Sequence, residues 1–422
     1  MSQPSDILID DFVAPVLPEA VRAMNAVSPE EARRQVALDS ASLHAEATEK
    51  TGLSDFGADH YREGMDVFLR ALEAEADLTL LGRMTARAYV VKLLASRLRI
   101  EAAIAHTPAL LERPLERPVI IVGLPRTGTS HLHNLLSVHP DLRFLPYWEA
   151  CEPIPVPGDV ARSGAPDPRI ARVQATLDQG TALIPHQQAM HELDAHTPHE
   201  EIGFFEMDFA CPIFSNRFQV PTYRAWYRKA DLTPSYGYVR RVLQVVSGLR
   251  DGGKRWVLKS PMHLEQIGPL MKVHPNARVV LTFRDPARVI LSLATMTAYG
   301  RRVVQRTIDP VRIGQEVATM IQQRFDAAVR DVHLIPASQR RDVHFESYMK
   351  DPMTVVREVL DFAGLDASEA TMGRMRAYQD RNPRGKFGRV IYRYEDVGLD
   401  PEVLRQASRV YREKFGVKAE AD

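Results

Sequence analysis

Short apolar runs, separated by amphipathic stretches, mark the chain from about residue 118 onward. Residues Val119 to Val122 are all apolar, and Gly123 ends the run. A run of this length without polar alternation is typical of a strand buried on both faces of a parallel sheet. Residues 255–259, 278–283 and 342–345 are candidates for the same role. We therefore expect four strands of one parallel sheet.

Apolar residues recur at helical spacing between and after these strands, in residues 128–138, 263–273, 286–297, 310–334, 352–363, 368–379 and 401–415. Alternation of strands and helices predicts an α/β domain in which helices cover both faces of a central parallel sheet. Residues 1–115 are instead helical throughout, with expected helices at 29–51, 59–75 and 80–106. We expect two parts: an N-terminal helical region, 1–115, packed on the core, and an α/β domain, 116–422.

A long insertion at about 150–250 separates the first two expected strands. Its early part is rich in proline, and residues 201–240 hold ten of the 31 aromatic residues of the chain. This aromatic cluster is either a small core beneath the insertion or the wall of an apolar ligand pocket. The sequence leaves both interpretations open.

The charge balance limits the classes of partner. The 422 residues include 54 basic and 54 acidic side chains, so the formal net charge is zero. A neutral chain lacks the global field that holds nucleic acid or an anionic membrane. We find no signal peptide and no apolar run of 18 residues, and two cysteines, Cys151 and Cys211, make no disulfide framework. We expect a cytoplasmic protein without an integral membrane segment; its oligomeric state is not indicated.

The strongest chemical motif runs from Gly123 to Ser130, between the first strand and a helix, and contains Arg126, Thr127, Gly128 and Thr129. A glycine-bearing turn of this kind points backbone N–H groups at an anion, and the helix N-terminus adds positive potential. Thr129 stands where the Walker A motif of nucleotide kinases requires lysine. The cation here is Arg126, whose guanidinium binds phosphate or sulfate with two parallel hydrogen bonds. The motif predicts a P-loop-type fold that holds a phosphate or sulfate.

Two further segments place cations at strand ends. Arg284 ends one expected strand, and Ser292 follows eight residues later on a helix, where two turns bring it back toward the strand end. Lys259 ends another strand, and ligand sites of parallel sheets lie at those ends. The alternatives are a salt bridge for Arg284, a helix-interior hydroxyl for Ser292 and a surface position for Lys259.

Together these three segments resemble the sulfotransferase superfamily that uses 3′-phosphoadenosine 5′-phosphosulfate (PAPS), and within it the bacterial branch with a Leu-Pro-Arg-Thr-Gly-Thr phosphate loop. The resemblance covers about residues 118–417. It implies that residues 126–130 hold the 5′-phosphosulfate of PAPS, that Arg284 and Ser292 hold its 3′-phosphate, and that Lys259 lies near the reaction centre. It also suggests that Lys386 belongs to a loop that closes over the 3′-phosphate. The reaction implied is in-line transfer of a sulfuryl group to a hydroxyl or amine of a small acceptor, without a metal.

The resemblance offers two candidates for the general base, Glu149 and His263. A third group is the segment 191–201 of the insertion, which as a whole could contact the acceptor or even supply the base, and which contains His199 and Glu200. It fails the spacing of a HExxH metal site. With Phe204 and Phe205 these residues are our candidates for acceptor binding, and the aromatic cluster favours an apolar, hydroxylated acceptor.

Two other functions compete with this interpretation. A P-loop small-molecule kinase would require lysine at position 129 and Mg²⁺. A non-catalytic PAPS-binding protein of the same fold is expected to have lost Arg126, Lys259, Arg284 or Ser292, and all four are present.

Overall fold

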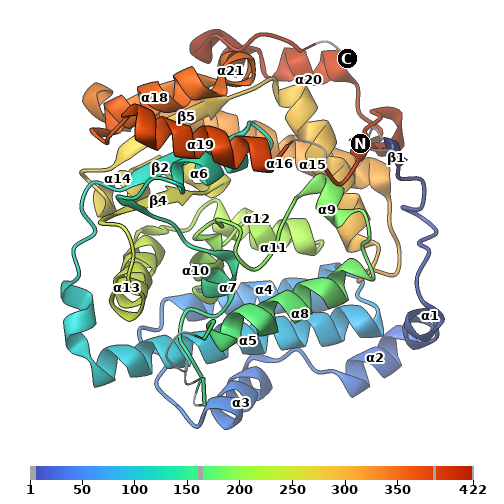
Figure 1. Ribbon diagram of the computed structural model, residues 1–422. Coiled ribbons are helices and arrows are strands. Elements are labelled where there is room, and N and C mark those ends of the chain that lie inside the picture. The colour runs from blue at the N-terminus through green and yellow to red at the C-terminus, as the bar shows by residue number, and fades with distance from the viewer. Residues whose placement is uncertain (1–5, 157, 160–164, 384–385, 421–422) are drawn as a thin grey trace.

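A parallel sheet of five strands lies at the centre of the protein (Figure 1). The computed structural model describes residues 6–156, 158–159, 165–383 and 386–420. The strands are β2 (Val119–Gly123), β3 (Leu142–Arg143), β4 (Arg255–Lys259), β5 (Arg278–Phe283) and β6 (Arg340–His344), in the order β3-β4-β2-β5-β6 with every neighbouring pair parallel. The predicted α/β fold with a central parallel sheet is confirmed, and β3 adds a strand that the sequence analysis did not predict.

Helices cover both faces of this sheet, as the continuous apolar character of β2 requires. Val119 and Ile121 belong to a buried cluster with α6 (Thr129–Leu136), α18 (Pro352–Ala363) and α19 (Glu369–Arg381). Ile120 and Val122 belong to the larger cluster on the other face, with α13 (Thr233–Leu249), α15 (Pro286–Arg301) and α16 (Pro310–Asp331). Side chains alternate between the two faces of a strand, so the same run of residues contributes to both clusters.

The first hundred residues are helical: α1 (Glu19–Asn25), α2 (Pro29–Gln35), α3 (Ser40–Thr51), α4 (Tyr61–Glu75) and α5 (Leu80–His106). The prediction of one helix over 29–51 was wrong. Ser28 caps α2 by accepting from the backbone N–H of Glu31 at 3.2 Å, and Asp39 caps a separate helix by accepting from Ser42 at 2.8 Å. Figure 1 shows α3, α4 and α5 below the sheet, with the insertion between.

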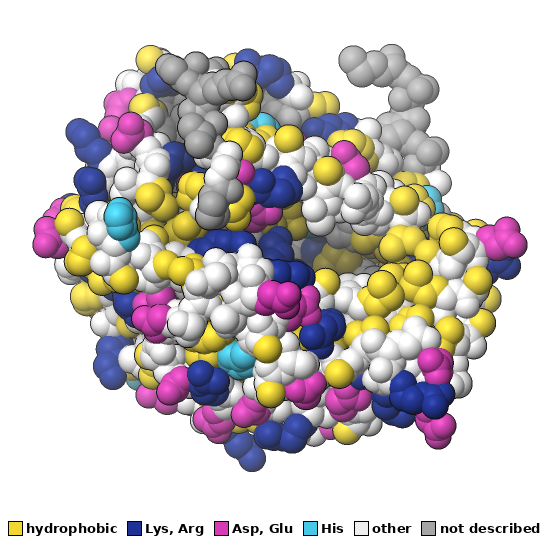
Figure 2. All heavy atoms as spheres, turned by 90° about the horizontal axis from the view of Figure 1, so that it is seen from below, with side chains coloured by type: hydrophobic (Ala, Val, Ile, Leu, Met, Phe, Trp, Pro, Cys, Tyr) yellow, Lys and Arg dark blue, Asp and Glu magenta, His cyan; other side chains and the backbone are white. Residues whose placement is uncertain are grey.

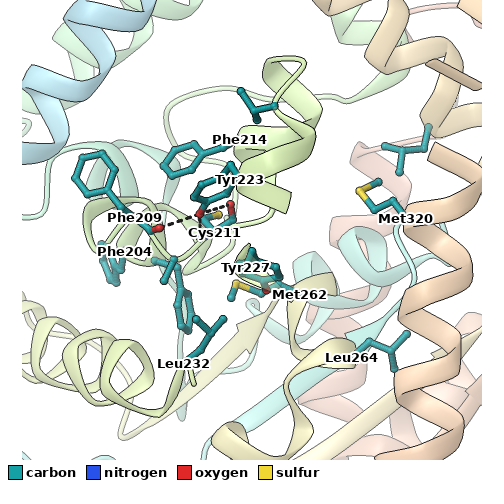
Figure 3. Packing of buried hydrophobic residues seen from close by; sticks show 14 of the residues in the cluster. Phe204, Phe209, Cys211, Phe214, Tyr223, Tyr227, Leu232, Met262, Leu264 and Met320 are labelled. Carbon is teal, nitrogen blue, oxygen red and sulfur yellow. Dashed lines mark hydrogen bonds between the residues drawn. The ribbon is translucent and has the colours of Figure 1, made fainter. Parts of the chain in front are cut away.

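The insertion contains α7 (Tyr147–Cys151), α8 (Pro168–Thr181), α9 (Gln187–Met190), α10 (Ile202–Met207), α11 (Ile213–Arg217) and α12 (Pro221–Tyr227) before α13. Its aromatic cluster is packed as a core (Figure 3). Tyr223 is fully buried, and its hydroxyl donates to the carbonyl of Phe209 at 2.8 Å and accepts from the N–H of Cys211 at 3.0 Å. Of the two interpretations left open, the core interpretation describes most of these rings.

The C-terminal part contains α14 (Ile267–Val273), α17 (Phe345–Lys350), α20 (Pro401–Ala407) and α21 (Arg409–Phe415), so Ser408 divides the single helix expected at 401–415. Two short strands, β1 (Asp6–Leu8) and β7 (Arg389–Ile391), form a separate parallel pair that was not predicted. Across the described ranges, every helix is too short or too polar to cross a bilayer.

Candidate active site

The segment Gly123–Ser130, called the phosphate loop below, connects the end of β2 to the start of α6 and is tightly packed. Gly123 lies so close to β5 that a Cβ atom there would be 2.1 Å from the Thr282 hydroxyl oxygen. Gly128 has φ +84°, and Arg126 also has a positive φ of 66°. The hydroxyl of Thr127 points into the core, donating to the Leu124 carbonyl at 2.7 Å. The side chain of Thr127 therefore fixes the loop. The backbone N–H groups of the first turn of α6 are held at the carboxyl end of the central strand β2.

The two segments that the sequence analysis assigned to one phosphorylated ligand meet in the structure. Arg126 donates through Nε to the Ser292 hydroxyl at 3.2 Å and through Nη1 to the Met190 carbonyl at 2.7 Å. Arg284 donates through Nη1 to the backbone carbonyl of Arg126 at 2.7 Å. Arg126, Arg284 and Ser292 thus form one contiguous cluster of two cations and a hydroxyl at the carboxyl ends of β2 and β5.

The remaining donors of Arg284 are occupied by a residue near the C-terminus. Glu420 accepts from Nε at 2.7 Å and from Nη2 at 2.8 Å, so the contact is bidentate. The backbone N–H of Glu420 donates to Asp285 at 2.9 Å, and its carbonyl accepts from Arg405, also at 2.9 Å. The Arg284 guanidinium stacks over the ring of Phe345 at 4.0 Å. A carboxylate therefore lies where this arginine was expected to bind a phosphate.

Lys259 connects the phosphate loop to the insertion. Its side chain is buried, and Nζ lies 3.3 Å from the Ser130 hydroxyl and 2.5 Å from a carboxylate oxygen of Glu200. The other oxygen of Glu200 accepts from the Ser260 hydroxyl at 3.3 Å. The sequence-predicted residues Ser130, Lys259 and Glu200 are thus brought together, and a surface position for Lys259 is excluded.

Burial, helped by the positive charge of nearby Lys259, lowers the pKa values of three histidines. Burial first, and then the charges of Lys259 and Arg126, lower the pKa of His191 to about 3. Burial and Lys259 lower the pKa of His133 to about 3, and the same two causes hold the pKa of His199 well below its ordinary value. All three imidazoles are therefore neutral at physiological pH.

The two predicted bases both have internal partners. Glu149 is buried at the start of α7, and its two oxygens accept from Arg250 at 2.9 and 2.8 Å. His263 is buried as well, with hydrogen bonds of 2.6 Å to Glu201 and 2.7 Å to the Tyr236 hydroxyl. Burial alone would raise the pKa of Glu201, but the hydrogen bond and charge of His263 outweigh it and keep the pKa below its ordinary value.

The remaining predicted site residues differ in how deeply they are buried. Phe204 and Phe205 are 0% and 1% exposed and pack in the core. Thr129 is buried at the first turn of α6. Lys386 forms an ion pair with Glu192 of the insertion, and the two residues before it, Arg384 and Gly385, lie outside the described residues.

Sequence reasoning missed two residues that contact this site. Glu201 joins His263 to the backbone of Lys259, whose N–H it accepts at 3.1 Å, and its place beside Glu200 was the available signal. Glu420 is 136 residues from Arg284, and nothing in the local sequence indicates their pairing. No group of three or more metal-ligating side chains occurs among the residues that the structure describes.

Comparison with protein families decides the assignment. The model of the sulfotransferase family matches residues 118–369, more than half of the chain and the part that carries the whole cluster described above. The chain belongs to the sulfotransferase family. The matched segment begins at β2 and includes the phosphate loop, Lys259, Arg284 and Ser292.

Solved structures agree with this family. The sulfotransferase STF9 from Mycobacterium avium is 27% identical, with a TM-score of 0.81 over 91% of this chain and 98% of that one. The sulfotransferase STF1 from Mycobacterium tuberculosis H37Rv is 29% identical, with a TM-score of 0.77 over 87% of this chain and 98% of that one. A search of curated protein sequences finds no match. Nothing in these comparisons favours a kinase or a non-catalytic binding protein, and the protein is a sulfotransferase.

Proposed function

We propose that this sulfotransferase uses PAPS as its donor and a small hydroxylated molecule as its acceptor. The observation that carries the proposal is the contact between Arg126 and Ser292, 3.2 Å apart, because it joins two segments that lie 166 residues apart in the chain. Each segment had been assigned to a different phosphate of the same donor. Their convergence is what a ligand with both a 5′-phosphosulfate and a 3′-phosphate requires.

The residues present fit such a donor. Arg126, the N–H groups at Gly128 to Ser130 and the helix N-terminus suit the 5′-phosphosulfate, and the buried Lys259 suits the oxygen that becomes negative as the sulfuryl group leaves. Arg284 and Ser292 suit the 3′-phosphate, which would replace the carboxylate of Glu420. Lys386 precedes β7 and pairs with Glu192 of the insertion, and its contact with the same phosphate remains an expectation.

The donor supplies an activated sulfuryl group, and the protein has to orient the acceptor and remove its proton. His199 and Glu200 lie on the insertion beside Lys259, and we assign acceptor binding to this segment, with Phe204 and Phe205 shaping it from beneath. An apolar, hydroxylated acceptor and a cytoplasmic location remain our expectations. The resemblance offered Glu149 and His263 as the base, and each would first have to release its internal partner, Arg250 or Glu201.

The donor assignment is tested by isothermal calorimetry with 3′-phosphoadenosine 5′-phosphate, the product form of the donor, in metal-free buffer. We expect micromolar binding to the wild-type protein and a loss of about tenfold or more in Arg284→Ala, because a charge-assisted bidentate contact is removed. Arg330→Ala is the matched control, since Arg330 is exposed and pairs only locally with Asp331.

Two results would contradict the proposal. One is tighter binding of ATP with Mg²⁺ than of the product nucleotide, which would favour a kinase-type ligand. The other is equal affinity for the product with and without its 3′-phosphate, which would remove Arg284 and Ser292 from donor binding.

A further inference from the structure

The contacts of Lys259 single out one acidic side chain in the site. Glu200 touches the ammonium of Lys259 at 2.5 Å, and the ammonium in turn touches Ser130 of the phosphate loop at 3.3 Å. The carboxylate is therefore two contacts away from the loop that holds the transferring group. The side chain of Glu200 is 16% exposed, compared with 1% for the side chain of Glu149 and 2% for that of His263, so it lies on a wall that solvent reaches.

The backbone on both sides of Glu200 is anchored. The N–H of His199 donates to the Leu145 carbonyl at 2.7 Å, and Pro198 forms a bridge with Pro146. On the other side, the Glu201 carboxylate accepts from the backbone N–H of Lys259 at 3.1 Å, and its other oxygen is hydrogen-bonded to Nε2 of His263 at 2.6 Å. A catalytic carboxylate needs this kind of support, because misplacement by about 1 Å costs up to about a hundredfold in rate.

The neighbouring imidazoles are poor alternatives. His191 and His199 lie near the same lysine, but burial and the nearby cations lower their pKa values so far that they take up a proton only weakly. Glu200 has one oxygen on Lys259 and the other on Ser260, and both partners are hydrogen-bond donors. The ion pair with Lys259 and the hydrogen bond from Ser260 keep the carboxylate in place.

We propose that Glu200 is the general base that removes the proton from the acceptor hydroxyl, an inference that rests on the proposed function. When the donor binds, its negative charge draws the Lys259 ammonium away and frees one oxygen of Glu200. The acceptor O–H proton moves to that oxygen while the acceptor oxygen forms a bond to sulfur. The bond between sulfur and the 5′-phosphate oxygen breaks, and its electron pair stays on the phosphate, next to Lys259.

The test separates loss of a base from loss of structure. We expect Glu200→Gln to bind 3′-phosphoadenosine 5′-phosphate as tightly as wild type or more tightly, because the competitor for Lys259 loses its charge. Turnover of PAPS with phenol should fall about 10²- to 10⁴-fold, the usual contribution of a general base. With 4-nitrophenol at a pH where it is ionised, the loss should be much smaller, because no proton has to be removed. If the wild-type protein accepts neither phenol, the rate of PAPS hydrolysis by water, measured in the same reactions, replaces turnover as the readout.

Glu152→Gln is the matched control, since it removes the charge of another carboxylate of similar side-chain exposure, 20%, that pairs with Arg172 instead of Lys259. Equal losses with both phenols in Glu200→Gln, or weaker nucleotide binding, would assign Glu200 a structural role and overturn the proposal. Unchanged hydrolysis and turnover would also overturn it. Failure of wild type itself to bind the nucleotide would instead refute the proposed function, so the two failures are distinguishable.

Discussion

The guanidinium of Arg97 joins the N-terminal helical region to the insertion. It is 0% exposed and lies between the rings of Tyr61 and Tyr238, at 4.2 and 4.4 Å from their centres. Its Nη1 donates to Asp208 of the insertion at 2.6 Å, and its Nε donates to the carbonyl of Phe56 at 2.6 Å. The N-terminal helices and the insertion therefore share a buried charge pair.

Arg97→Ala should lower the free energy of unfolding by about 3–5 kcal/mol, because it leaves the buried Asp208 carboxylate without its guanidinium, with the His60 imidazole 2.9 Å away as its remaining ion-pair partner. Urea denaturation of the two proteins measures the difference. Arg87→Ala is the control on the same helix: Arg87 is partly exposed and pairs with Glu46, so its loss should cost about 1 kcal/mol or less. Equal losses of unfolding free energy in the two variants would show that the burial of the Arg97–Asp208 pair does not increase its contribution to stability.

Individual site residues were predictable where the chemistry depends on local spacing. Arg126 and Ser130 lie on a strand-to-helix turn, and Arg284 and Ser292 lie eight residues apart, so both pairs can be found by inspection. The partner of Glu149 could not be predicted, because Arg250 lies 101 residues away and many arginines in the chain could pair with it. The burial of Phe204 and Phe205 was undecided, since an aromatic ring has the same sequence signature in a core and in a pocket.

Among the elements, the segment after α21 has the most direct relation to the site. Its residue Glu420 occupies two donors of Arg284, and the contacts with Asp285 and Arg405 hold the segment across the end of β5. If Arg284 binds the 3′-phosphate as proposed, phosphate and carboxylate cannot occupy the guanidinium at the same time. The segment then competes with the donor.

Glu420→Ala should therefore bind 3′-phosphoadenosine 5′-phosphate about two- to tenfold more tightly, the range expected for a partly exposed, bidentate ion pair. Calorimetry at fixed ionic strength measures the change. Glu413→Ala is the matched control, because Glu413 is exposed on α21 and only 3.9 Å from Arg409. Weaker binding in Glu420→Ala would show that the carboxylate supports the site rather than competing for it.

The elements themselves were predictable in proportion to their length and burial. β2, β4 and β5 form where the apolar runs are, because a strand buried on both faces has little freedom in its composition. β1, β3 and β7 have two or three residues each, too few for a period to be recognised. Ser28 and Asp39 divide a helical stretch that periodicity alone joined, so the capping residues determine the boundary.

Across the whole molecule the acidic and basic side chains are equal in number. Two buried histidines, in contrast, have no hydrogen-bonded carboxylate within the described part of the chain that would stabilise their protonated form. Figure 2 shows basic and acidic side chains spread over one face, with a hollow near its centre. His133 and His274 are buried, and burial lowers their pKa values to about 3 and about 4. The Nδ1 atoms of both rings lack a hydrogen-bond partner among the residues that the structure describes. Protonation of either ring would place an unpaired charge in the interior.

The folded protein should lose stability as the pH falls from about 6.5 toward 4. In this window the unfolded chain protonates its histidines near their ordinary pKa of 6.5, whereas the folded chain does not, so acid favours unfolding. Each such histidine contributes up to about 1.4 kcal/mol per pH unit. Urea unfolding at a series of pH values measures the slope, and His274→Asn should make it shallower. An unchanged slope would mean that His274 is protonated in the folded state.

The short pairing of β1 with β7 has a practical consequence for handling the protein. Asp6 and Arg389 form an ion pair at 2.9 Å beside this pairing, and β7 packs against α9, whose last residue, Met190, accepts the guanidinium of Arg126. The pairing therefore links residue 6, through β7 and α9, to the residue whose carbonyl Arg126 contacts. An N-terminal affinity tag is attached ahead of this pairing, so ligand-binding constants are best compared before and after the tag is cleaved.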